Sequence, residues 1–175
     1  MWIKYIFIVL LFYLFSILQN SFFVHFSLFG AIPNLVFVFF FLLAFFEPKN
    51  NHYQIVFYAI SAGLFLDFFS YTYFGVSIIL LLLIGSAMKK IQAILHEKRD
   101  DRFPLLYFLP LFTISLIFYD LLLNVFLNKF NLAQIVSGFS ISEIIYNLLF
   151  ASVAFYVYKK FLGLRFDDRQ LALFR

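Results

Sequence analysis

The sequence predicts an all-α integral membrane protein, folded as a compact bundle of about six transmembrane helices. Of its 175 residues, 65% are hydrophobic and 13% are charged, whereas soluble domains carry about 45–50% apolar and about 25% charged residues. A soluble fold of this length has no core large enough for that excess, so lipid must accept it. Six helices of about 20 residues fill the chain, and we expect one transmembrane domain over residues 1–175. The predicted spans are 4–26, 31–46, 53–69, 74–90, 103–127 and 139–158.

The first three spans follow from apolar runs and the breaks between them. The first apolar run begins at Tyr5, directly after Lys4, and has no small-residue cleavage site after it, so we interpret the span 4–26 as a retained helix and not as a signal peptide. Gly30 and Pro33 mark the first break, and a proline suits the first turn of the next helix. That helix ends at the turn-forming residues 47–51. The third run, 53–69, contains the small residues that favour close helix packing in lipid.

Gly75 opens the fourth span, 74–90, after a tight connection. The second and fourth apolar runs are short for a full crossing, so flanking residues or local thinning of the bilayer would have to complete them. Residues 89–102 form the longest polar stretch and are predicted to be a cytoplasmic loop.

The fifth span, 103–127, and the sixth, 139–158, are joined by a short connection, and a basic tail covers 159–175. Membrane β-strands would alternate apolar and polar residues. The run Val36–Phe46 is apolar without alternation, so helices are favoured.

The distribution of positive charge predicts the orientation. Cytoplasmic loops carry an excess of lysine and arginine, and with six spans twelve of the thirteen such residues fall on one side. We therefore expect both termini in the cytoplasm, with Lys129 alone outside. The twelve are Lys4, Lys49, Lys89, Lys90, Lys98, Arg99, Arg102, Lys159, Lys160, Arg165, Arg169 and Arg175.

Three carboxylates, Asp67, Asp120 and Glu143, fall inside predicted spans, where an ionisable group costs about 2.5 kcal/mol or more. Asp120 and Asn124 are four residues apart and share one face of the fifth helix, as Glu143 and Asn147 do on the sixth. All five residues are predicted to lie in the outer half of the bilayer. We expect the two faces to meet, because a short connection favours packing of the two helices.

This outer cluster has two interpretations. It binds a partner helix or a ligand, or it serves only for hydrogen bonding between helices. A proton relay is disfavoured because the spans hold no histidine or lysine suited to it.

Most other chemistry is excluded. The chain has no cysteine and only three scattered histidines, so we expect no disulfide, no metal site and no cofactor. No paired nucleophile and base and no phosphate-binding loop appears, which argues against an enzyme. The net charge of +4 is explained by the topology signal and does not indicate nucleic acid. Membrane lipid is the expected surrounding partner.

At the centre of the chain, Gly63 is followed by a short apolar step, then by Asp67, and then by Gly75, which opens the next predicted helix. Near the end of the first predicted helix, the segment with Gln19 and Ser21 has the order Leu-Gln-Asn-Ser. The first pattern resembles the MreD family of bacterial rod shape-determining proteins, whose members show a glycine, a short apolar step, an aspartate and then a glycine that opens the next helix. The second pattern resembles that family's Leu-Gln-x-Ser.

The family's Gly-x-x-Pro-Asp-Leu is similar to the segment with Gly30, Pro33 and Asn34, where asparagine replaces the commoner aspartate. The size and the six-span plan also match over nearly the whole chain. The resemblance implies a non-catalytic scaffold of the cell-elongation and peptidoglycan-synthesis machinery in the bacterial inner membrane, with an MreC-like protein and other elongation proteins as partners.

A second function stays open. The MreD family is similar to the substrate-binding subunits of vitamin transporters, which have six helices and an outward-facing pocket. Asp67, Asp120, Glu143 and Asn147 would then line a pocket for a small molecule. A small enzyme of lipid metabolism is a third, weaker possibility.

Overall fold

The computed structural model of the chain describes residues 2–27, 30–47, 52–69, 73–95, 104–127 and 141–161. The predicted outer connection with Lys129, most of the predicted polar loop and most of the basic tail lie outside these residues. In the described part the regular elements are helical and no strand is formed, which confirms the all-α class. They are α1 (Trp2–Ile17), the π-helical turn η1 (Leu18–Phe22), α2 (Leu35–Phe46), α3 (His52–Phe69), α4 (Val76–Leu95), α5 (Pro104–Leu127) and α7 (Ile141–Phe161).

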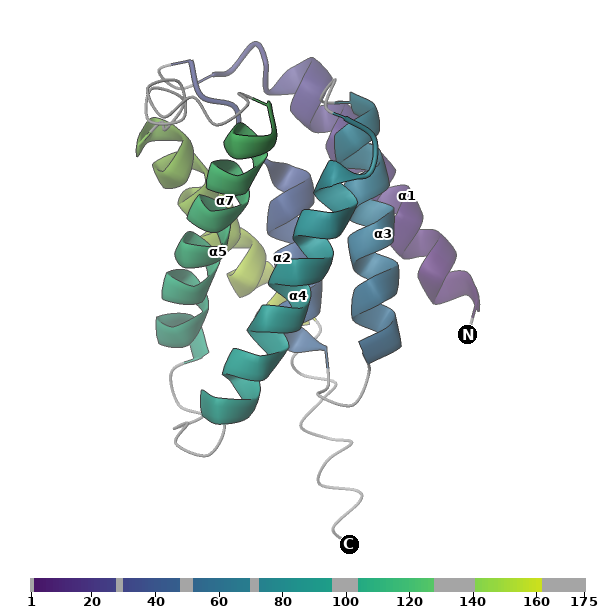
Figure 1. Cartoon of the computed structure of the whole chain (residues 1–175). Helices are drawn as coiled ribbons and strands as arrows, with labels where there is room; N and C mark the ends of the chain where they lie inside the picture. Colours follow the sequence, from purple (N-terminus) through teal and green to yellow (C-terminus); the bar gives the residue numbers. More distant parts are fainter. Residues whose placement is uncertain are drawn as a thin grey trace, which may run out of the picture.

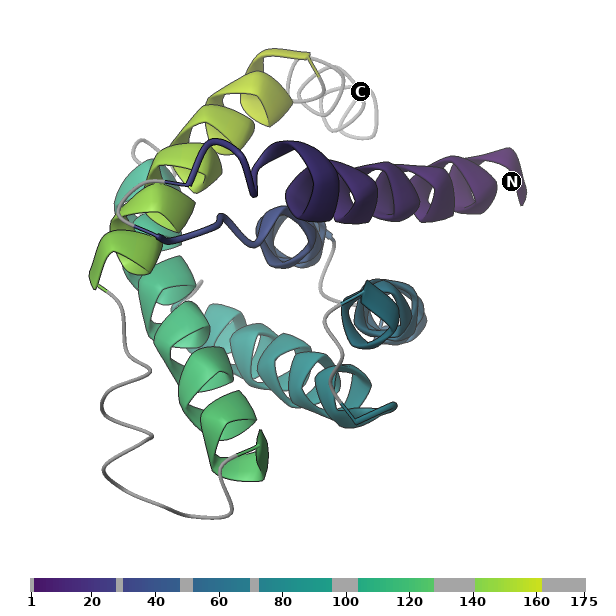
Figure 2. The same cartoon turned by 90° about the horizontal axis from the view of Figure 1, so that it is seen from above.

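Helix α2 is the centre of the bundle. It contacts α1, α3, α4, α5 and α7, and Figure 2 shows it end-on with the other helices around it. Nine of its 12 residues are buried. Because protein replaces lipid on all its sides, this helix is apolar around its whole circumference.

The helix bundle has two ends, an inner end and an outer end. The inner end holds the starts of α1, α3 and α5 and the ends of α2, α4 and α7, and the outer end holds the opposite termini (Figure 1). The charge distribution predicts that the inner end faces the cytoplasm.

The predicted number of about six spans is higher than the described helices support. Four are long and apolar enough to cross a membrane: Ile3–Phe22, His52–Phe69, Leu105–Leu127 and Ile141–Lys160. Helix α2 is a shorter apolar helix, and its 12 residues give a length of about 18 Å against about 30 Å of hydrocarbon. The central position of α2 explains why it is short, because a helix enclosed by its neighbours need not match the bilayer.

Helix α4 differs from the prediction at its inner end. It continues to Leu95, so the first residues of the predicted polar loop are helical. Lys89 and Gln92 are both 5% exposed. These two polar side chains lie inside the bundle, where they bind backbone carbonyls at the end of α2.

The core is built from aromatic rings. Phe37, Phe41 and Phe45 follow one another at four-residue intervals on α2 and meet Phe108 and Phe112 of α5 edge to face, with ring centroids 5.1–5.8 Å apart. Edge-to-face pairs stabilise beyond their buried area. The abundant phenylalanine is therefore more than apolar filler: part of it forms the contact between α2 and α5.

Candidate functional site

Asp67, one of the residues on which the sequence resemblance rests, binds the start of the next helix. Its carboxylate accepts hydrogen bonds from the backbone N–H of Gly75 at 2.6 Å and of Ser77 at 3.0 Å, and its side chain is 4% exposed. The first N–H groups of a helix have no partner within the helix, and a negative charge is stabilised there by the helix dipole. Asp67, at the end of α3, therefore caps α4.

The two glycines of the same motif allow this geometry. Gly75 has φ +98°, a left-handed conformation that a residue with a Cβ adopts only at a cost. A Cβ on Gly63 would lie 2.6 Å from both the N and the Cα of Ile78, so the backbones of α3 and α4 touch there. The motif of Gly63, Asp67 and Gly75 builds one tight α3–α4 hairpin.

A buried hydroxyl pair continues this site into α5. The Oγ of Ser77 and the OH of Tyr119 lie 3.1 Å apart, with the two residues 1% and 3% exposed. The sequence reasoning missed this pair, because a serine and a tyrosine 42 positions apart carry no spacing signal.

Asn34 caps α2 and ties its start to α7. Its side-chain oxygen accepts a hydrogen bond from the N–H of Phe37 at 3.0 Å, and its own N–H donates to Oδ1 of Asn147 at 2.7 Å. Asn147 is 0% exposed, and its Nδ2 donates to the carbonyl of Glu143 at 3.0 Å. Asn34 is thus the N-cap of α2, a position at which asparagine is strongly preferred.

The predicted outer cluster is only partly assembled as expected. Helices α5 and α7, which carry Asp120 and Glu143, pack together. Both residues and Asn124 are half-buried. The side chain of Asn147, however, joins the segment before α2. Asp67 belongs to the α3–α4 hairpin, so the five predicted residues serve at least two distinct sites.

The first motif segment lies in the π-helical turn η1. Asn20 donates from Nδ2 to the carbonyl of Ser16 at 2.9 Å, and Nδ1 of His25 lies 2.9 Å from the carbonyl of Ser21. Oε1 of Gln19 is buried without a hydrogen-bond partner. This π-helical turn continues α1 and ends the helical segment at Phe22.

A second polar centre, absent from our predictions, lies at the inner end. Nζ of Lys89 donates to the carbonyl of Glu47, and Nε2 of Gln92 donates to the carbonyl of Phe45 at 3.0 Å. The last carbonyls of a helix have no partner within it, and a cation there is stabilised by the dipole. Two side chains of α4 therefore cap the end of α2.

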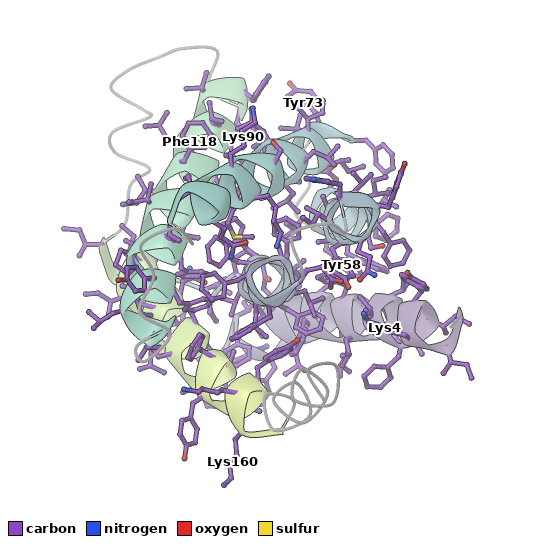
Figure 3. The ribbon with its side chains drawn as sticks, turned by 90° about the horizontal axis from the view of Figure 1, so that it is seen from below. Lys4, Tyr58, Tyr73, Lys90, Phe118 and Lys160 are labelled. Atoms are coloured by element: carbon purple, nitrogen blue, oxygen red, sulfur yellow. The ribbon has the colours of Figure 1, made fainter. Side chains whose placement is uncertain are left out.

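The same centre extends to α3 and α1. The OH of Tyr58 lies 2.8 Å from Oε2 of Glu47 and 3.0 Å from Oε1 of Gln54, and Nζ of Lys4 donates to Oε1 of Gln54 at 3.4 Å. Figure 3 shows Tyr58 where α1, α2 and α3 meet, with Lys4 on α1 beside it. Lys4 and Lys89, which the sequence analysis used only to predict orientation, therefore also form hydrogen bonds between helices.

The cavities of the bundle do not coincide with the predicted polar cluster. One of 540 Å³ lies between α1 and α3, one of 210 Å³ between α4 and α5, and one of 370 Å³ between α3 and α4. None of these three is lined by Asp67, Asp120, Glu143 or Asn147. Over the described ranges, no group of three or more histidine, cysteine or acidic residues is placed to hold a metal ion.

Comparison with known proteins gives one family. The model for the rod shape-determining protein MreD matches residues 2–171 of the chain. No curated protein and no solved structure matches it. The match spans the α3–α4 hairpin and the capped starts of α2 and α4, where the motif residues lie. The chain therefore belongs to the MreD family of rod shape-determining membrane proteins.

Proposed function

We propose that this protein is a non-catalytic, multi-pass scaffold in the bacterial cytoplasmic membrane, which binds an MreC-like protein within the cell-elongation machinery. Family membership supports a role in rod shape. The proposed partner, the membrane and the absence of catalysis go beyond that membership and rest on how the chain uses its polar residues.

The observation that carries the proposal is the use of the motif residues within the fold. Asp67 is bonded to Gly75 and Ser77, and Asn34 is bonded to Phe37 and Asn147. Side-chain oxygens that accept hydrogen bonds from backbone N–H groups hold helices in place, and they have little hydrogen-bonding capacity left for a substrate. Such an arrangement favours a structural scaffold over a catalyst.

The partner contact that we propose is the outer, half-buried pair Asp120 and Glu143. A half-buried carboxyl group inside a membrane span is costly, and a partner that supplies hydrogen-bond donors or a cation to Asp120 and Glu143 would relieve that cost. Asn147 is unsuited to this role because it is fully buried inside the fold.

The test is co-purification from membranes with the MreC-like protein of the same bacterium. We expect the wild type to retain that protein and Asp120→Asn with Glu143→Gln to retain less of it at unchanged expression. Ser86→Ala, at an exposed serine on α4, serves as the control. A cell that lacks the gene should lose its rod shape and regain it with the wild type.

The alternative, a small-molecule-binding subunit, predicts a different result. Native mass spectrometry of the detergent-purified protein would then show a stoichiometric ligand of vitamin size. We expect lipid adducts at most, since the walls of all three cavities are mainly apolar. A stoichiometric ligand together with failure to retain the MreC-like protein would reject the scaffold function.

A further inference from the structure

We propose that the groove between α1 and α3 is a binding site for one anionic phospholipid of the inner-end leaflet, with an acyl chain in the groove and the phosphate at Lys4. The groove has a volume of 540 Å³ and is lined from α1 by Tyr5, Ile6, Val9 and Leu10 and from α3 by Tyr53, Gln54 and Phe57. This site is independent of the proposed scaffold function.

The groove is apolar at one end and polar at the other, as a lipid molecule is. Its deep part is apolar, through Val9 and Leu10. Its mouth at the inner end has two tyrosines, Tyr5 and Tyr53, and Tyr53 is 91% exposed. Tyrosine is enriched at the level of the headgroups because its ring is apolar and its hydroxyl is polar.

The charge at the mouth selects an anion. Lys4 stands on α1 next to Tyr5, and its Nζ donates to Oε1 of Gln54, which lines the groove. An ammonium has three N–H donors, and the Lys4 side chain is exposed, so donors remain for a phosphate. Basic residues near the cytoplasmic leaflet attract its anionic lipids.

The size of the groove favours a lipid chain over a transmembrane helix of a partner. A helix about 10 Å wide with a pitch of 5.4 Å fills about 420 Å³ per turn. A volume of 540 Å³ therefore holds little more than one turn, whereas a crossing needs about 20 residues. One unbranched hydrocarbon chain is the slender occupant that fits.

The chain contains its own probe for the test. Trp2 is the only tryptophan of the sequence and begins α1, two residues before Lys4. The protein is reconstituted in phosphatidylcholine vesicles in which a fraction of the lipid is replaced by brominated phosphatidylglycerol or brominated phosphatidylcholine. Bromine quenches tryptophan fluorescence at short range, so the ratio of the two quenching curves gives the preference for the anionic lipid at this position.

We expect the wild type to prefer phosphatidylglycerol about fivefold, the effect of one basic residue near the surface. Lys4→Gln should remove the preference and Lys4→Arg should keep it. Lys90→Gln is the matched control, because Lys90 is exposed on α4, away from Lys4 (Figure 3). Equal loss in Lys4→Gln and Lys90→Gln would show only diffuse attraction and overturn the proposal.

A second pair of variants tests the groove itself. Val9→Phe fills it and should remove the preference, while Leu14→Phe, at an exposed position of α1, should not. Retention of the preference in Val9→Phe would overturn the groove as the site. A wild type without preference, with Val9→Phe failing to retain the MreC-like protein, would assign the groove to a protein partner and overturn the proposal as well.

Discussion

Asp67 accepts a 2.6 Å hydrogen bond from the backbone N–H of Gly75, eight residues further along the chain. This bond joins the end of α3 to the start of α4 and places a negative charge at the positive end of a helix dipole. Since Asp67 is buried, its N–H partners would have little water to replace it. The bond therefore fixes the geometry of the hairpin at the outer end.

Replacement of Asp67 should lower thermal stability. Asp67→Ala leaves the N–H groups of Gly75 and Ser77 without their acceptor, at a cost of about 1–3 kcal/mol. Asp67→Asn keeps one acceptor oxygen and should lose less. The loss of stability in each variant is measured as the midpoint of thermal unfolding in detergent, with size-exclusion chromatography as the readout of the folded fraction. A midpoint for Asp67→Ala equal to that of the Ser86→Ala control would contradict the capping role.

Gly63→Ala should destabilise the protein more than Gly85→Ala. At Gly63 the new Cβ meets the backbone of Ile78 at 2.6 Å, whereas at Gly85 it meets the Cγ2 of Ile55 at 2.7 Å. A side-chain methyl can move, but a helix backbone moves only with its whole element, so we expect about 1–3 kcal/mol at Gly63. The two variants are compared by the same unfolding midpoint, and the reverse order would show that α3 and α4 are less tightly packed.

Asn147→Leu should leave the protein inserted but less stable. The change removes the acceptor of the Asn34 N–H, which then lacks a partner at a cost of about 1–3 kcal/mol. Leu149→Ala, at a position 54% exposed, is the matched control on α7 and should have a small effect. Membrane fractionation and unfolding midpoints separate insertion from stability, and an unchanged midpoint would mean that the α2–α7 bond contributes nothing.

Lys89→Met and Lys90→Met should differ although the residues are neighbours. Lys89 caps the end of α2 and its loss should cost about 1 kcal/mol, while Lys90 is exposed and its loss should be nearly neutral. Methionine keeps the length and the apolar part of the side chain in both. Equal midpoints would show that the cap is replaced by another donor.

Reporter fusions test the orientation. Because twelve of thirteen basic residues lie on one predicted side, fusions at Arg99 and Arg175 should report the cytoplasm and one at Lys129 the outside. A fusion at Arg175 that reports the outside would reject an even number of crossings.

Local sequence determined much of this protein. Long apolar runs, prolines and glycines between them and intervals of four residues depend on neighbouring positions only, so they predicted the all-α membrane class and the approximate helix positions. The motif with Gly63, Asp67 and Gly75 is also local, and the sequence identified it. The function of its members as one hairpin needed the structure, since a glycine does not show which backbone it approaches.

Only the tertiary structure decided which helix is central and which polar residues meet. Lipid and protein interior are both apolar, so hydropathy does not distinguish the enclosed α2 from its lipid-facing neighbours. The bond between Asn34 and Asn147 joins positions 113 residues apart, and no local pattern encodes it. The charge of Lys89 predicts a cytoplasmic loop, yet Lys89 is buried because the end of α2 offers it the carbonyl oxygen of Glu47. The composition of a helix determines whether its surroundings are apolar or aqueous, whereas the packing of the whole chain determines which helices and side chains it contacts.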